Sequence, residues 1–116
     1  MSEPVYKICD AAAWQAASRR GRYEGSPVDV RDGFIHFSSR AQLAGTAEKH
    51  FAGQDNLVLV TVNPERLGAA LKWEPSRGGA LFPHLYGALE MDAILSVEPL
   101  PLGADGRHRF PDGGGQ

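Results

Sequence analysis

Runs of alternating or continuous apolar residues predict several short strands along this chain. Residues 57–62 form the clearest strand, because six consecutive positions are almost all apolar and three of them are valine, as in the centre of a sheet. Shorter runs predict further strands at residues 5–9, 34–37, 71–74, 82–87 and 93–100. Strands of this kind with helices packed on them favour an α+β fold with a small, mostly antiparallel β core.

Two main helices are predicted among these strands. The first covers residues 11–20, between Asp10 as its N-cap and Gly21 at its end. The second follows a capping box made by Ser39 and Gln42. Its buried stripe recurs at a spacing of four residues and consists of Leu43, Ala47 and Phe51.

Residues 21–33 are predicted to be a loop, because they are rich in Gly, Ser, Pro and Asp and include few core candidates. Such a loop is long for a connection without a role of its own. A lid or rim beside the next strand and a merely irregular connection both fit this pattern. Residues 1–116 are expected to form a single domain, with an ordered core over about 4–102 and a flexible tail over 103–116.

Composition narrows the classes of protein that the chain fits. With 42% hydrophobic and 22% charged residues, it has the balance of an ordinary globular protein. A formal net charge of -2 gives no electrostatic case for binding nucleic acid. No apolar run approaches the ~20 residues that span a bilayer, and no signal sequence is recognisable, so the expected location is the cytoplasm. The single cysteine, Cys9, lies in an apolar strand pattern and is expected to be buried.

The first candidate for chemistry is His36, in the strand that follows Asp32 and Gly33. Strand periodicity places it on the same face as Phe34 and Ser38. Because these two neighbours differ in polarity, the face fits a pocket wall as well as a core in which the imidazole is hydrogen-bonded. The sequence leaves both alternatives open.

The second candidate is the segment 82–87, where His84 and Tyr86 share a strand face. They offer an imidazole that titrates near neutral pH and a phenol within reach of the same ligand. Glu74 lies beside Trp73 at a strand end, where an indole can desolvate the carboxylate and raise its pKa, as suits a general acid or base. An exposed glutamate and a half-buried structural tyrosine are the alternatives.

A metal ion is the rival use of these groups, since His36, His84 and Glu74 could hold one and leave a coordination position open. Their spacing matches no metal-binding signature. The chain also lacks a Walker loop, a nucleophile elbow and a Gly-x-Gly-x-x-Gly motif, which argues against the commonest hydrolases and nucleotide-binding folds.

Taken in order, these motifs resemble the bacterial domain-of-unknown-function 952 family. The resemblance runs from about residue 5 to residue 100, and its two histidine motifs are specific. The residues that carry it are 5–8, Trp14, 33–38, Gln42, Ala47, Phe51, 57–59, 73–74 and 82–87. The family has no established activity, so membership implies a fold rather than a function.

That family is in turn remotely similar to the ADP-ribosyltransferase-like fold, whose members bind NAD in a cleft between two small sheets. This resemblance implies that His36 takes the place of a tyrosine that stacks on nicotinamide, and that Ser38 lies near the ribose. Lys7 is the nearest match to the His or Arg that grips the ribose from the first strand. The glutamate of those enzymes falls near His84, where this chain has no carboxylate, although Glu74 could substitute for it.

We therefore expect a cleft that binds NAD, ADP-ribose or a related nucleotide. Catalytic roles are assigned to His36, His84 and Glu74, and ligand contacts to Ser38, Trp73, Tyr86 and Lys7; no resident metal is assigned. Glu74 or His84 would be the base at the glycosidic bond. Two other functions stay open: a metal-assisted hydrolase, and a non-catalytic module that binds a protein or peptide through an apolar patch beside residues 21–33. The sequence gives neither the substrate nor the oligomeric state.

Overall fold

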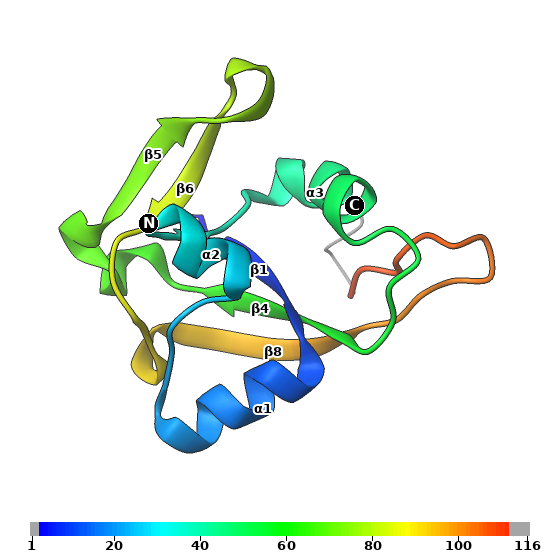
Figure 1. The fold of residues 1–116 in the computed structure, drawn as a ribbon, viewed down its shortest axis with the longest axis horizontal. Helices are drawn as coiled ribbons and strands as arrows, with labels where there is room; N and C mark the ends of the chain where they lie inside the picture. Colours follow the sequence, from blue (N-terminus) through cyan, green and yellow to red (C-terminus); the bar gives the residue numbers. More distant parts are fainter. Residues whose placement is uncertain (1–2, 112–116) are drawn as a thin grey trace.

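Antiparallel sheets and three α-helices make up the computed structural model, which describes residues 3–111 (Figure 1). One sheet has the order β1-β4-β8, with strands Val5–Asp10, Leu57–Val62 and Ile94–Leu100. Another has the order β3-β6-β5, with strands Ile35–His36, Leu81–Leu85 and Leu71–Pro75. A small sheet pairs β2 (Arg22–Tyr23) with β7 (Leu89–Glu90). The helices are α1 (Ala11–Arg20), α2 (Pro27–Asp32) and α3 (Leu43–His50). The α+β class with an antiparallel core is thus confirmed.

The strand β4 lies at the centre of its sheet, as its sequence predicts. It pairs with β1 on one side and with β8 on the other, so that Val60 stands between Lys7 and Val97. The other predicted strands also form, with ends that differ by one or two residues. The strand before Ser38 shrinks to Ile35–His36, and short 3-10 turns fill several connections, at Arg40–Gln42, Pro64–Arg66, Gly68–Ala70, Arg77–Gly79 and Met91–Ala93.

The two main predicted helices are confirmed together with their caps. At the start of α1 the Asp10 carboxylate accepts a hydrogen bond from the backbone N–H of Ala13 at 3.0 Å. Gly21 ends this helix with a φ of 91°, a conformation that favours glycine. Before α3, Gln42 Oε1 accepts a hydrogen bond from the backbone N–H of Ser39 at 2.9 Å, as in the predicted capping box.

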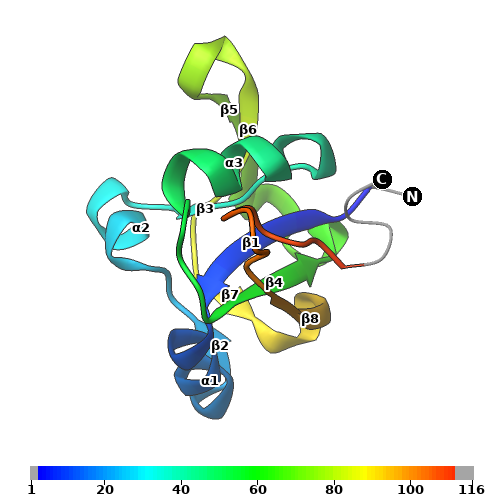
Figure 2. The same cartoon turned by 90° about the vertical axis from the view of Figure 1, so that its right-hand side faces the viewer.

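The helices α1 and α3 cover opposite faces of the β1-β4-β8 sheet (Figure 2). Alternate residues of a strand point to opposite faces, which divides the core into two clusters. One cluster joins Trp14 and Ala17 of α1 to Val5, Cys9, Val60 and Val62. The other joins Leu43 and Ala47 of α3 to Tyr6, Ile8, Leu57 and Leu59.

The prediction of a loop over residues 21–33 is wrong, because this segment contains β2 and the short helix α2. Ser26 precedes the helix, Pro27 is its first residue, and Asp29 at the third position accepts a hydrogen bond from the backbone N–H of Ser26 at 2.8 Å. Gly33 ends the helix with a φ of 88°. The Gly, Ser, Pro and Asp residues of this segment therefore cap and flank a short helix rather than form a loop.

Residues 103–111, which belong to the predicted tail, fold back along the molecule. Leu102 pairs with His108 in a β-bridge, and His108 Nε2 donates to the carbonyl oxygen of Gln54 at 2.8 Å. The rest of the predicted tail, residues 112–116, lies outside the described residues. Within residues 3–111, none of the helices has the length and apolar character needed to cross a membrane.

Candidate ligand-binding site

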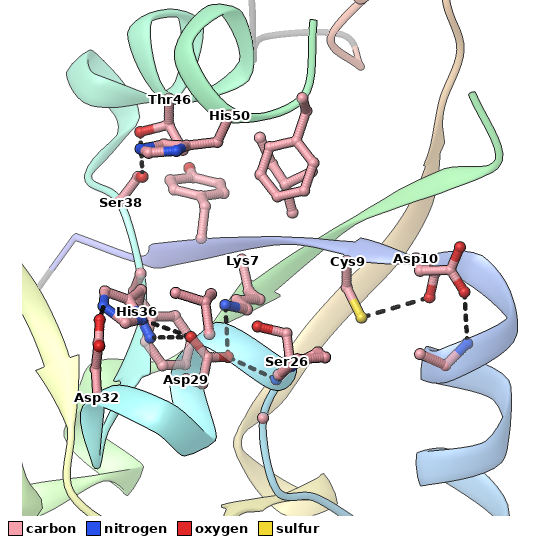
Figure 3. Close-up of a pocket in the computed structure, with 18 of the residues that line it drawn as sticks. Lys7, Cys9, Asp10, Ser26, Asp29, Asp32, His36, Ser38, Thr46 and His50 are labelled. Atoms are coloured by element: carbon pink, nitrogen blue, oxygen red, sulfur yellow. Dashed lines mark hydrogen bonds and ion pairs between the residues drawn. The ribbon is translucent and has the colours of Figure 1, made fainter. Parts of the chain in front are cut away.

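A cavity of about 680 Å³ lies beside β1, with α2 on one side and α3 on the other (Figure 3). Every residue from 6 to 10 lines it, and so do residues 36–38. Since consecutive residues of a strand point to opposite faces, a cavity that touches all of them runs along the edge of the strand. Its volume lies in the range of pockets that hold small molecules.

The cavity exists because β1 separates from the segment that carries His36. Tyr6 and Ser38 exchange two backbone hydrogen bonds of 2.8 Å. In the same antiparallel register the next pair would be Ile8 with His36, but the backbone N–H of His36 donates instead to Asp29 Oδ1 at 3.1 Å. Among the described residues, the outward N–H and C=O of Ile8 therefore have no strand partner, and they lie on the edge that faces the cavity.

Asp29 is a buried carboxylate that ties α2 to both neighbouring strands. Lys7 Nζ donates to its Oδ2 at 2.8 Å, and His36 Nδ1 lies 2.6 Å from its Oδ1 (Figure 3). Burial by itself raises the pKa of Asp29, but the hydrogen bond from His36 and the charge of Lys7 outweigh it and hold this pKa well below its usual range. Asp29 is consequently ionised, and it neutralises the buried Lys7 ammonium.

His36 is engaged through both ring nitrogens. Its Nε2 lies 3.1 Å from Asp32 Oδ2, while its Nδ1 faces Asp29. Both ring nitrogens of His36 therefore face carboxylate oxygens. The pKa of Asp32 is lowered, and the main cause is the hydrogen bond that it accepts from Arg31. His36 thus holds two residues of α2 against β3.

Glu74 lies on β5 and receives two hydrogen bonds on the same oxygen. Tyr86 donates its O–H to Glu74 Oε1 at 2.7 Å, and His84 Nδ1 lies 2.8 Å from the same atom. The bond from His84, followed by that from Tyr86, lowers the pKa of Glu74. The expectation that Trp73 raises this pKa is wrong, because neighbouring residues of a strand point to opposite faces and the indole is 48% exposed.

His84 stands directly opposite His36 in the β3–β6 pairing, with 5.5 Å between the ring centroids. The ring of Phe34 stacks on it at 4.1 Å. His84 is 4% exposed, and its Nε2 makes no hydrogen bond within the described part of the chain. Both imidazoles line the cavity.

The seven residues singled out from the sequence occupy three different places. Those that line the cavity are Lys7, His36, Ser38 and His84. Ser38 is buried, and its Oγ lies 2.8 Å from Thr46 Oγ1. Glu74 contacts His84, and Tyr86 contacts Glu74, both from outside the cavity lining. Trp73 lies on the opposite face of β5 and does not contribute to the cavity.

Sequence reasoning missed the residues that α2 and the strand edge contribute. Asp29 was available from the pattern Ser26-Pro27-Val28-Asp29, which has an N-cap residue, a first-position proline and an acidic third position. The open edge at Ile8 has no signal in the sequence, because it depends on which strand pairs are absent.

The histidines and Glu74 do not come together as a set of metal ligands. Glu74 binds His84, while His36 binds Asp29 and Asp32. Within residues 3–111, no group of three or more His, Cys, Asp or Glu side chains is arranged to hold a metal ion. Cys9 also lines the cavity, where burial raises the pKa of its thiol.

Comparisons with known proteins identify relatives of the chain. The model of a family described as a protein of unknown function (DUF952) matches residues 8–97. The crystal structure of protein CC0527 from Caulobacter crescentus is 50% identical, and its match covers 97% of this chain and 99% of that chain with a TM-score of 0.91. The solution NMR structure of CC0527 is 51% identical over 95% of each chain, with a TM-score of 0.84. No curated protein matches.

These findings do not bear on the resemblance to the ADP-ribosyltransferase-like fold, which stays a prediction. They do bear on the family, because the matched residues span most of the chain and include both histidine motifs. The chain belongs to the DUF952 family.

Proposed function

We propose that the cavity binds a small molecule along the edge of β1, and that its ligand is NAD or a related nucleotide carrying a carboxamide. The observation that carries this proposal is the outward N–H and C=O of Ile8, which face the cavity without a strand partner among the described residues. A primary carboxamide presents a carbonyl acceptor and an N–H donor side by side, so it can take the place of the missing strand.

The charge of the cavity wall supports a ligand whose buried end is neutral. Asp29 already neutralises Lys7, and a phosphate placed there would be a second anion beside a buried carboxylate. A nicotinamide ring avoids this cost, while the diphosphate would extend toward solvent past Arg31, which is exposed at the rim. The remote resemblance to the ADP-ribosyltransferase-like fold supports the same ligand.

The test is a titration of ¹⁵N-labelled protein followed through its backbone amide signals. Nicotinamide and NAD are expected to shift the amide signal of Ile8, whereas nicotinic acid, which has a carboxylate in place of the carboxamide, leaves it unchanged. NAD at 100 times its dissociation constant adds about 2.7 kcal/mol of stability, or roughly ten degrees in melting temperature. An unchanged Ile8 signal together with an unchanged melting temperature contradicts the proposal.

A second function, the docking of a protein or peptide, is favoured by one observation. Val28 is 43% exposed and Val30 is 69% exposed on α2, in the segment beside which an apolar patch was expected. Exposed aliphatic residues are common on ordinary surfaces, so this observation carries less weight than the open strand edge. The variant Val30→Ser separates the two, because Val30 does not line the cavity and its replacement should leave the nicotinamide titration intact.

A further inference from the structure

The imidazole of His84 has a nitrogen that the rest of the chain does not use. More than nine-tenths of the surface of His84 is buried, yet its Nε2 makes no hydrogen bond within residues 3–111. A buried polar atom without a partner destabilises the folded protein. Such an atom is rare in folded proteins and calls for a specific explanation. Because His84 lines the cavity, a molecule bound there can supply the missing partner once the side chains that cover Nε2 move aside.

The surroundings of Nδ1 decide what kind of partner Nε2 needs. Glu74 holds a lowered pKa because His84 and Tyr86 both bond to its Oε1, so it is a carboxylate that only accepts hydrogen bonds. Nδ1 therefore carries the proton that lies between the two residues. In the neutral ring Nε2 is then a free lone pair, and its missing partner is a donor.

The same contacts separate the roles of the two residues. Glu74 is occupied by two donors and lies outside the cavity lining, so it is poorly placed to take a proton from a ligand. His84 lines the cavity, and the stacked ring of Phe34 fixes its plane. A carboxylate that fixes the tautomer of an imidazole is a recurring way to prepare a histidine as a base.

We infer that His84 is the proton acceptor of this site, and that Glu74 is a positioning residue that keeps the Nε2 lone pair available. The inference rests on the proposed function, since it requires a ligand in the cavity. The group that meets Nε2 is a hydroxyl, either of a ribose or of a water molecule. When that hydroxyl ionises, its O–H bond breaks, the electron pair stays on the oxygen and the proton moves to Nε2. The resulting imidazolium is stabilised by Glu74.

The experiment is a long-range ¹H–¹⁵N correlation spectrum of the histidine rings in the full chain, with and without NAD. The wild-type protein is expected to show His84 as a single tautomer with its proton on Nδ1. Glu74→Gln removes the anionic acceptor and is expected to lose this single tautomer. Tyr86→Phe is the matched control, because it removes the other bond to Glu74 and leaves the carboxylate on Nδ1. NAD is expected to shift the Nε2 signal as this nitrogen accepts a hydrogen bond.

The outcomes separate this inference from the proposed function. A wild-type His84 with its proton on Nε2, or a Glu74→Gln variant with an unchanged tautomer, overturns the inference without reference to any ligand. With NAD present, a shift at Ile8 but not at His84 Nε2 overturns the inference and leaves the proposed function standing. A shift at Nε2 alone supports the inference and contradicts carboxamide recognition by Ile8. No shift at either position overturns both.

Discussion

His36 and His84 stand opposite each other in the β3–β6 pairing, but their rings differ in how many nitrogens are hydrogen-bonded. Both nitrogens of His36 face carboxylates of α2, at 2.6 Å and 3.1 Å. Only Nδ1 of His84 has a partner, and its Nε2 has none within the described residues. Two histidines with similar sequence surroundings can therefore have different hydrogen-bonding partners in the folded protein. His36 holds the cavity wall in place, while the role proposed for His84 uses the nitrogen that has no partner among the described residues.

This contrast also explains why α2 can be short and still form a wall of the cavity. A six-residue helix has little stability of its own. Asp29 anchors it to Lys7 on β1 and to His36 on β3, and both bonds are inaccessible to solvent on the carboxylate side. The wall is therefore expected to depend on one ionised side chain.

The largest effect on the unfolding free energy is expected from a variant that removes the charge of Asp29, the carboxylate that contacts both His36 and Lys7. Asp29→Asn preserves the shape of the side chain but leaves the buried Lys7 ammonium without a counter-charge. Removing one partner of a buried ion pair costs about 3–5 kcal/mol, and urea unfolding measures this loss.

The matched control is the double variant Lys7→Met/Asp29→Asn, which removes both charges and should regain part of the lost stability. A loss of less than about 1 kcal/mol in the single variant, or no recovery in the double variant, would show that the pair does not anchor α2.

Low pH tests the contribution of Asp29 to stability in a second way, through the pKa of its carboxyl group. This pKa lies below its ordinary value of 3.8 in the folded protein, so folding favours the ionised form. The stabilising contribution is complete above the ordinary value and is lost as the pH falls through the lower, folded value. The gap in unfolding free energy between wild type and Asp29→Asn should therefore shrink when unfolding is repeated between about pH 6 and 2. A gap that stays constant over this range contradicts the assignment.

On the His84 side, a smaller effect is expected from Tyr86→Phe. Tyr86 is 42% exposed, so its removal should hardly change the unfolding free energy. The pKa of Glu74 should rise toward its ordinary value of 4.5 without reaching it, because the bond from His84 remains. A carboxyl ¹³C titration measures this pKa, and an identical value in both proteins would mean that Tyr86 does not contribute to the pair.

Much of the fold could be predicted from the sequence because its signals are local. The apolar run of β4, the Asp10 cap of α1 and the capping box before α3 each specify an element within a few residues. The two histidine motifs were visible for the same reason, since strand alternation places His36 beside Phe34 and Ser38.

The rest could not be predicted, because it depends on distant contacts. A six-residue helix is too short to show helical periodicity, and the bond that anchors α2 joins residues 22 positions apart. The cavity arises where one pair of a strand register fails to form, beyond the bridge from Tyr6 to Ser38. Trp73 was predicted to contact the ligand because it precedes Glu74 in the sequence, although adjacent residues of a strand point to opposite faces.

The most direct test of the account compares the unfolding free energies of His36→Phe and His84→Phe in urea. Both variants put a similar ring in a similar place on adjacent strands. His36→Phe leaves the buried Asp29 without one of its donors, a loss of about 1–3 kcal/mol. His84→Phe removes a nitrogen that has no partner among residues 3–111 and leaves Glu74 partly open to water. His84→Phe is expected to be the more stable variant by at least about 1 kcal/mol. An equal or larger loss at His84 would contradict it and make His84 an ordinary structural histidine.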